Sequence, residues 1–165
     1  MAYNNNYNKT NYNNADRSNR NNGWDKPKFQ FDSAARITQP LSIYYANKTD
    51  VYLPENKLYL LAQSISKLTN SQIRKVLDLT KESLSIIRYS EADFEKAKVR
   101  LFTLLPMTAY NAGRASKGDR QSFEKLLEFI YENVNPESIQ CAADIQVFDQ
   151  LITTVVAYHK FLGGK

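Results

Sequence analysis

The stretch KLTNSQIRKVLDLTKESLSIIR, residues 67–88, predicts one amphipathic helix and so decides the fold class. Thr69 and Gln72 are three residues apart, so each side chain can accept a hydrogen bond from the backbone amide of the other, as in a capping box. Leu68 and Ile73 flank this box as a hydrophobic staple. Apolar residues then recur at helical spacing and predict one buried face: Ile73, Val76, Leu77, Leu84 and Ile87.

A row of cations follows the other side of the same helix. Arg74, Lys81 and Arg88 are seven residues apart. Seven residues are close to two helical turns, with a drift of only ~20° per step. Such a row can contact phosphates of a polyanion. A solvated helix face has the same pattern, because Asp78 and Glu82 can offset the positive charge, so the helix alone leaves both interpretations open.

The composition predicts one folded domain with a tail. The chain has 165 residues, a net charge of +5 and one cysteine, Cys141, which we interpret as a small core residue. One cysteine and one histidine exclude a disulfide framework and a two-histidine metal site, so we expect no metal and no cofactor. The sequence has no recognisable secretory or transmembrane segment. We therefore expect a cytoplasmic protein with no membrane partner.

The charge is unevenly distributed along the chain. Residues 67–120 hold eleven Lys or Arg against six Asp or Glu, whereas residues 121–150 hold one Lys against six acids. We therefore expect a basic side, which suits a polyanion, and an acidic side, which can meet a basic partner or a neighbouring copy of the chain.

Two segments precede the helical region. Residues 1–30 have ten asparagines in the first twenty-two positions and few apolar residues, so we expect a disordered tail. Its tyrosines and arginines can bind RNA, or the tail can act only as a solubilising segment. Residues 31–57 are interpreted as a linker that can dock on the domain surface. The predicted boundary separates this tail and linker, 1–57, from a helical domain, 58–165.

Further helices are predicted on both sides of residues 67–88. A first helix can begin at Pro54, and Ser90 can cap a third helix through a second capping box with Asp93. Pro106 must kink or restart that helix, because its ring clashes with the preceding turn. Asp119 is predicted to cap a fourth helix.

The last helical region is predicted to begin at Asn135-Pro136 and to end at Gly163, with room for a break near Ala142-Ala143. Its residues are apolar on more than one side, which predicts the most buried helix. No alternating strand pattern of useful length occurs. Together these patterns predict an all-α fold, a compact bundle of about five to six helices preceded by a disordered Asn-rich N-terminal tail.

A turn in the second half of the chain combines small residues with cations. The stretch AYNAGRASKGDR, residues 109–120, has alanines around Gly113, and Arg114, Lys117 and Arg120 stand at three-residue spacing. Small residues beside cations allow close approach to another backbone, whether of a neighbouring helix or of a phosphate chain. Gly113 can equally end a helix, and Lys117 can belong to an ordinary loop.

The sequence offers little for catalysis. His159 is the only histidine, and it can in principle form a dyad with a serine or with Cys141. A lone histidine on a helix is more often structural or turned to a partner. Glu124 and Glu128 have the spacing of a solvated acidic face and carry no specificity as an acid/base pair. We therefore expect a protein that is not an enzyme.

Three segments of the chain resemble a known family. The runs LTNSQIRKVL (68–77), AYNAGR (109–114) and VVAYHKFLGGK (155–165) are similar to the small helical subunit of type III-A CRISPR effector complexes, the Csm complexes. The segments follow the order of the family and cover roughly residues 58–165. The Asn-rich head is not part of the shared pattern.

The resemblance implies a non-catalytic, all-helical subunit that is present in more than one copy and acts in antiviral defence. Such a subunit stacks beside the subunits that hold the guide and lines the channel in which target RNA pairs with guide RNA. The implied partners are guide (CRISPR) RNA, target RNA, other subunits of the Csm complex and neighbouring copies of the chain.

The resemblance also implies which residues face RNA or brace that face. By position these are Gln72, Arg74, Lys75 and Arg114. The C-terminal motif adds His159 and Lys160, which can face RNA or pack against a neighbouring subunit. Helical geometry alone adds a further set: Lys81, Arg88, Arg100 and Lys117. Cations without stacking aromatic residues among them fit contact with the RNA backbone better than recognition of bases.

Two other hypotheses stay open beside an RNA-binding subunit. The chain can be a helical protein–protein interaction module with no direct RNA contact, and then charge reversal of Arg74, Lys81 and Arg114 would prevent assembly itself. An enzyme that uses His159 is the third hypothesis.

Overall fold

The protein is described by a computed structural model that covers residues 29–89 and 91–164. In this part of the chain the ordered elements are all helical, which confirms the predicted all-α fold. They are α1 (Leu41–Tyr44), α2 (Lys57–Ser64), α3 (Asn70–Tyr89), α4 (Phe94–Phe102), α5 (Leu104–Arg114), α6 (Lys117–Asn133) and α7 (Ala142–Phe161), with short 3-10 turns at Ser33–Ala35, Thr49–Tyr52 and Glu91–Asp93. The predicted disorder of residues 1–28 and the predicted cap at Ser90 lie outside the described residues.

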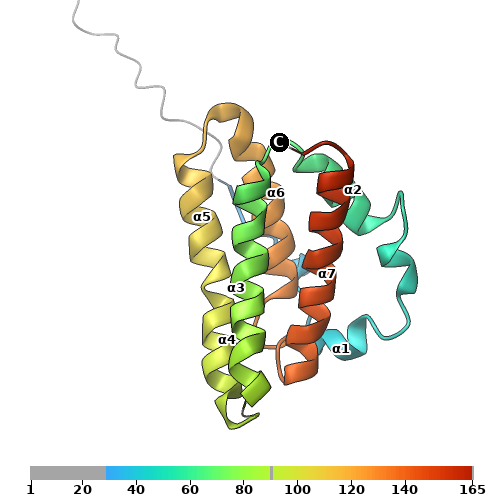
Figure 1. The fold of residues 1–165 in the computed structure, drawn as a ribbon, viewed down its shortest axis with the longest axis vertical. Helices are drawn as coiled ribbons and strands as arrows, with labels where there is room; N and C mark the ends of the chain where they lie inside the picture. The colour runs from blue at the N-terminus through green and yellow to red at the C-terminus, as the bar shows by residue number, and fades with distance from the viewer. Residues whose placement is uncertain (1–28, 90, 165) are drawn as a thin grey trace, which may run out of the picture.

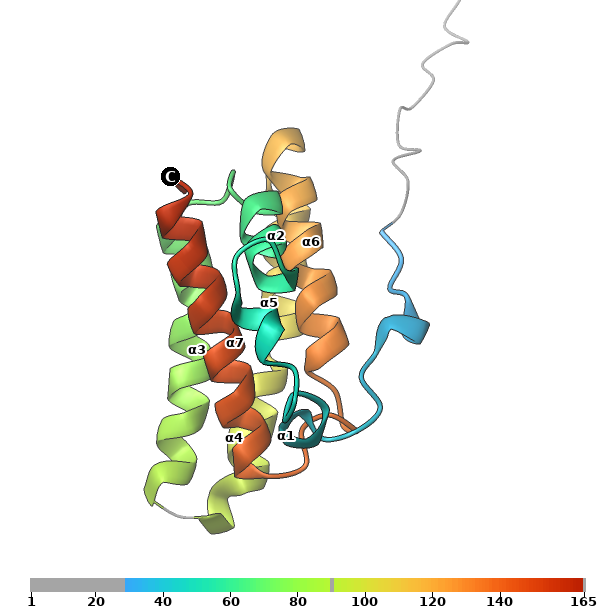
Figure 2. The ribbon, with the colours of Figure 1, turned by 90° about the vertical axis from the view of Figure 1, so that its right-hand side faces the viewer.

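The long helices run lengthwise in an antiparallel bundle (Figure 1). Helix α3 packs against α7 and against α4, and α5 packs against α6. Turning the molecule shows α3 and α7 on one side and α5 with α6 on the other, with α2 between α7 and α6 (Figure 2). This arrangement places the starts of α3 and α6 at the same end of the bundle as the ends of α5 and α7.

The predicted helix at residues 67–88 is α3, and its start is built as expected. The Thr69 amide donates to Oε1 of Gln72 at 2.7 Å, and the Gln72 amide donates to the Thr69 hydroxyl at 3.2 Å. Leu68 and Ile73 are buried on either side of this capping box. Val76 and Ile87 continue the buried face. The local sequence therefore fixes where α3 begins and which side of it meets the core.

Helix α7 supplies a large part of the core, in agreement with its apolar pattern. Ile145, Phe148, Ile152 and Val155 are fully buried, and α7 packs against α1, α2 and α3. The Phe148 ring stacks on that of Phe129 from α6, with ring centroids 6.2 Å apart.

Three predicted helix starts differ from the structure. Helix α2 begins at Lys57 instead of Pro54, with Asn56 as its N-cap. Helix α6 begins at Lys117, because Ser116 is its N-cap and accepts from the Asp119 amide at 3.3 Å, so Asp119 lies in the first turn. Helix α7 begins at Ala142 instead of Pro136, because the Asn135 side chain accepts from the amides of Glu137 and Ser138 and closes a turn. The start of α7 coincides with the break foreseen near Ala142-Ala143.

Cys141 is exposed, which corrects its assignment to the core. It precedes α7 as the N-cap, and its backbone amide donates to Oδ2 of Asp144 at 2.9 Å. The backbone hydrogen bond at the helix start, and not burial of the side chain, thus fixes the place of Cys141.

The predicted restart at Pro106 is confirmed. Helix α4 ends at Phe102, and α5 begins at Leu104. Pro106 is therefore the third residue of α5, where a helix does not use the backbone N–H and proline costs little.

Residues 37–51 belong to the same core as the helices that follow. Ile37, Leu41, Tyr45 and Val51 are buried in the main cluster. The Leu41 amide donates to the carbonyl of Ser138, and the Tyr45 hydroxyl donates to Oδ1 of Asn133. The segment interpreted as a linker thus packs against α6 and α7, and the domain boundary at residue 57 stays a prediction.

Candidate nucleic-acid interface

Four helix ends meet at one end of the bundle and form the candidate interface. Figure 1 shows the C-terminus beside the start of α3, with the connection from α5 to α6 at the same end. A hydrogen bond of 3.0 Å from the Asn70 side chain to the Gly164 carbonyl joins the start of α3 to the segment after α7. We call this end the basic end, after the cations described below.

A surface hollow lies between α3 and α5 at the basic end. It has a volume of about 250 Å³ and is lined by Gln72, Lys75, Asn111, Arg114, Ala115 and Phe123. Cavities that hold drug-sized ligands are usually larger, about 300 to 1,000 Å³. Two cations beside two side-chain amides suit a small anionic group such as a backbone phosphate. The structure thus brings together Gln72, Lys75 and Arg114, three of the predicted site residues.

Arg114 is held by its own helix. Its Nη1 donates to the Tyr110 hydroxyl at 2.9 Å, and its guanidinium carbon lies 5.4 Å from the centre of the Tyr110 ring. Tyr110 itself is 61% exposed. Tyr110 and Asn111 were not among the predicted site residues, although both lie in the AYNAGR run and stand four and three residues before Arg114. This spacing on a helix was the available signal.

Gly113 does not serve close packing within the chain. A Cβ atom at this position would have no neighbouring heavy atom within 4 Å. Gly113 lies in the last turn of α5, which ends at Arg114, while Lys117 and Gly118 form the first turn of α6. Gly113 thus lies at a helix end, one of the two interpretations left open, and packs closely against no helix of this chain, whereas the loop predicted as an alternative at Lys117 is wrong.

Two of the predicted cations are paired with acids of the same chain. Nζ of Lys81 lies 2.6 Å from Oδ2 of Asp149, so the middle of the predicted row bridges α3 to α7. Arg100 forms an ion pair with Glu82, between α4 and α3. A phosphate would compete with these carboxylates for the two cations. Contact of Lys81 and Arg100 with RNA stays a prediction.

The remaining predicted cations are exposed and form no ion pair within the described residues. Arg74 and Lys75 lie in the first turns of α3, Lys117 in the first turn of α6, and Lys160 in the last turn of α7. With Arg114 they belong to the helix ends that meet at the basic end. Arg88 lies in the last turn of α3, at the opposite end, beside a hollow lined by Leu84, Ile87, Ala142 and Gln146.

His159 is in the interior, 1% exposed, which corrects the expectation that it could face RNA or a neighbouring subunit. Burial lowers the pKa of His159 below its ordinary value of 6.5, although the backbone at Leu68 and Ile65 acts in the opposite direction. Cys141 is eighteen residues earlier on the same helix, about 27 Å away at 1.5 Å per residue, so the two cannot form a dyad.

Residues 29–89 and 91–164 contain no cluster suited to a metal ion, since no three or more His, Cys, Asp or Glu side chains gather there in one place. Among the helices of the same ranges, none is long and apolar enough to cross a membrane.

The fold and this site define a small all-helical protein whose unpaired predicted cations gather mainly at one end. A family model described as Csm2 Type III-A matches residues 57–165, and the chain belongs to this family. The match confirms the resemblance drawn from the sequence, and it makes the chain a subunit of a type III-A CRISPR complex. It spans α2 to α7 and every predicted site residue. No curated protein and no solved structure matches the chain.

Proposed function

We propose that the chain is a non-catalytic, RNA-binding subunit that lines the channel holding the guide/target RNA duplex in a cytoplasmic type III-A complex. The observation that carries this proposal is the hollow at the basic end, where Lys75 of α3 and Arg114 of α5 lie around one space. Arg74, Lys117 and Lys160 add positive charge at the same end of the bundle. The partners are guide RNA, target RNA, other Csm subunits and neighbouring copies of the chain.

Contact with the RNA backbone explains the residue types at this end. In a guided complex base pairing reads the sequence, so a subunit along the duplex needs to recognise only phosphates and shape. Lysine and arginine side chains at helix ends supply this contact, and the starts of α3 and α6 add a partial positive charge.

The test is the double variant Lys75→Glu/Arg114→Glu in the complex co-expressed with its other subunits. Binding of target RNA is measured over a series of salt concentrations. We expect weaker binding, and a salt dependence whose slope falls by about 0.7 to 0.9 units for each phosphate that is no longer neutralised. Lys96→Glu is the matched control, because Lys96 is an exposed cation near the start of α4, at the opposite end of the bundle from the basic end. Unchanged RNA binding by an assembled double variant would refute the proposal.

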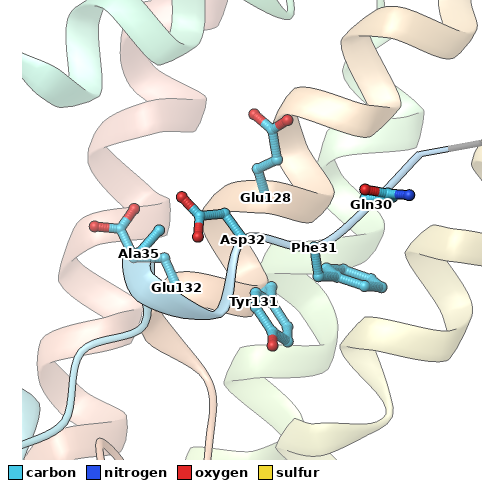
Figure 3. Close-up of a pocket in the computed structure, with 7 residues that line it drawn as sticks. All are labelled: Gln30, Phe31, Asp32, Ala35, Glu128, Tyr131 and Glu132. Atoms are coloured by element: carbon cyan, nitrogen blue, oxygen red, sulfur yellow. The ribbon is translucent and has the colours of Figure 1, made fainter.

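A protein-interaction module is the second candidate function, and an acidic hollow on α6 favours it. Asp32, Glu128 and Glu132 line this hollow together with Phe31 and Tyr131, and Figure 3 shows the three carboxylates on one side of it and the two rings on the other. The two rings lie 4.4 Å apart between centroids. Glu128 and Glu132 form ion pairs with Lys125 and Lys57 of the same chain, so a basic side chain of a partner protein would compete with these lysines for the acids of the hollow.

The two candidate functions predict different failures. If the basic end contacts protein alone, Lys75→Glu/Arg114→Glu prevents the chain from co-purifying with the complex. If it contacts RNA, the complex assembles and only its RNA binding weakens. Glu128→Lys tests the acidic hollow separately: loss of co-purification would assign that hollow to a protein partner.

A further inference from the structure

An aromatic ring stands beside the cations of the basic end, where the sequence suggested that none would. Tyr110 is 61% exposed, although it lies on a helix that packs against α6. Ala109 and Asn111, its neighbours in the chain, are small or polar, and Tyr110 is not among the residues packed against the hydrophobic core. Exposed aromatic rings beside cations are the residues that stack on nucleobases of single-stranded RNA.

The ring is held in a defined position. The Arg114 side chain donates to the Tyr110 hydroxyl at 2.9 Å, and its guanidinium carbon lies 5.4 Å from the ring centre. Both residues lie on α5, one turn apart, so helix geometry fixes their relative position. A ring that is already restrained loses less conformational entropy when a ligand stacks on it.

The same pair adjoins the hollow that suits a phosphate. Arg114 and Asn111 line that hollow together with Lys75 and Gln72. Tyr110 directly precedes Asn111 on α5. A nucleotide whose phosphate sits between Lys75 and Arg114 therefore has its base near the exposed ring. The amides of Asn111 and Gln72 can bond to the ribose 2′-hydroxyl or to a base edge.

We propose that Tyr110 and Arg114 form a stacking platform for one unpaired nucleobase of the RNA, an inference that rests on the proposed function. A base inside a duplex already stacks on its neighbours and is paired, so only an unpaired nucleotide offers a free face. The platform thus adds contact with one base to the backbone contacts of the basic end. The uncompensated cations around it favour RNA over an apolar protein surface as the occupant.

Three variants of the full chain separate stacking from other roles of the side chain. Tyr110→Phe keeps the ring and removes the hydroxyl, Tyr110→Leu keeps apolar volume without a ring, and Lys75→Glu/Arg114→Glu removes the phosphate contacts. Each is tested at low salt with a single-stranded RNA that carries the fluorescent base 2-aminopurine, and with a fully paired RNA duplex. Thermal unfolding followed by circular dichroism shows whether each variant is folded.

Stacking predicts a specific pattern. The fluorescence of the single strand should be quenched on binding to the wild-type chain and to Tyr110→Phe, but not on binding to Tyr110→Leu. The Leu variant should bind the single strand about 5- to 100-fold more weakly, as expected when one base–aromatic stack is removed. Its affinity for the duplex and the slope of its salt dependence should stay unchanged, because every cation that meets a phosphate is still present.

Other outcomes overturn the inference, and they distinguish it from the proposed function. Wild-type affinity and quenching by a folded Leu variant would refute stacking. Equal losses in the Phe and Leu variants would assign the role to the hydroxyl, and failure of Tyr110→Leu to co-purify with the complex would assign the ring to a protein contact. If Lys75→Glu/Arg114→Glu also binds both RNAs normally, the proposed function and the stacking inference both fail. If Lys75→Glu/Arg114→Glu loses RNA binding but Tyr110→Leu keeps it, only the stacking inference fails.

Discussion

Gly164 lies directly against the imidazole of His159. A Cβ atom built on Gly164 would be 1.9 Å from Cε1 and 2.2 Å from Nδ1 of the ring, distances that no real side chain tolerates. The Gly164 amide also donates to the His159 carbonyl at 3.0 Å, and its carbonyl accepts from Asn70 at the start of α3. The Gly163-Gly164 pair therefore covers the buried His159 at the end of α7. It also links the C-terminal segment to α3 through the hydrogen bond from Asn70, at the basic end.

Gly164→Ala should destabilise the fold by about 1 to 3 kcal/mol, the usual cost of an added methyl group that has no space. Either the buried ring must move, or the C-terminal segment must leave Asn70. Gly113→Ala is the matched control, because its Cβ meets nothing within 4 Å on a helix and alanine should be neutral or stabilising. Urea unfolding of the full chains measures both. Equal stability of Gly164→Ala and wild type would contradict the packing described here.

The stability of the fold should decrease in mild acid because of His159. Burial lowers the pKa of His159 in the folded state, so the unfolded chain takes up this proton at a higher pH than the folded chain. The contribution is present in full above the ordinary value of 6.5 and is lost as the pH falls from there through the lowered pKa. His159→Gln should remove this part of the pH dependence. Unfolding midpoints of both chains between about pH 7 and about pH 5 provide the measurement, and a flat wild-type profile would argue against it.

Asp144 should govern stability at lower pH. Burial alone would raise its pKa, but hydrogen bonds from Ser42, Gln140 and Cys141 outweigh burial and hold the pKa below the ordinary value of 3.8. The folded chain thus stays ionised where the unfolded chain is protonated, so stability is present above 3.8 and is lost as the pH falls below it.

Asp144→Asn tests this assignment. The carboxylate accepts from Ser42 at 2.8 Å and from Gln140 and Cys141 at 2.9 Å, whereas an amide cannot accept on both of its atoms. The variant should lose about 1 to 3 kcal/mol at neutral pH. Its unfolding midpoint should also fall less steeply than that of the wild type in acid. Parallel acid profiles of the two chains would show that another group is responsible.

Local sequence rules predicted the helices well where one segment carries its own signals. The Thr69/Gln72 box fixed the start of α3, and Pro106 marked the restart at α5. The starts of α6 and α7 were harder to predict. Ser116 and Asp119 have similar capping ability, and Asn135 closes a turn while α7 begins after Cys141, a residue type that capping rules do not favour. Only the hydrogen bonds chosen by the folded chain decide between them.

Interactions between distant parts of the chain lay beyond these rules. Residues 37–51 have too few periodic apolar positions to indicate a core segment, yet Leu41 and Tyr45 find partners about ninety to a hundred residues later. For the candidate site, spacing placed Arg74 in an exposed row along its helix, and the resemblance to the Csm small subunit indicated Lys75 and Arg114. Spacing could not show that Lys75 and Arg114 share one hollow, that Tyr110 stands beside them, or that Lys81 meets an acid of α7.

The Lys81–Asp149 pair should contribute to folding whether or not Lys81 contacts RNA. The Asp149 side chain is only 12% exposed, and its Oδ1 has no hydrogen-bond partner within the described residues, so Lys81→Met would leave a nearly buried carboxylate without a cation. We expect a loss of about 1 to 3 kcal/mol, largely recovered in Lys81→Met/Asp149→Asn. Arg100→Met is the control, since the exposed Arg100–Glu82 pair should contribute at most about 1 kcal/mol. Urea unfolding measures all three chains. A stable Lys81→Met variant that nonetheless weakens RNA binding by the complex would instead assign Lys81 to phosphate contact, and the predicted row along α3 would then extend the basic end.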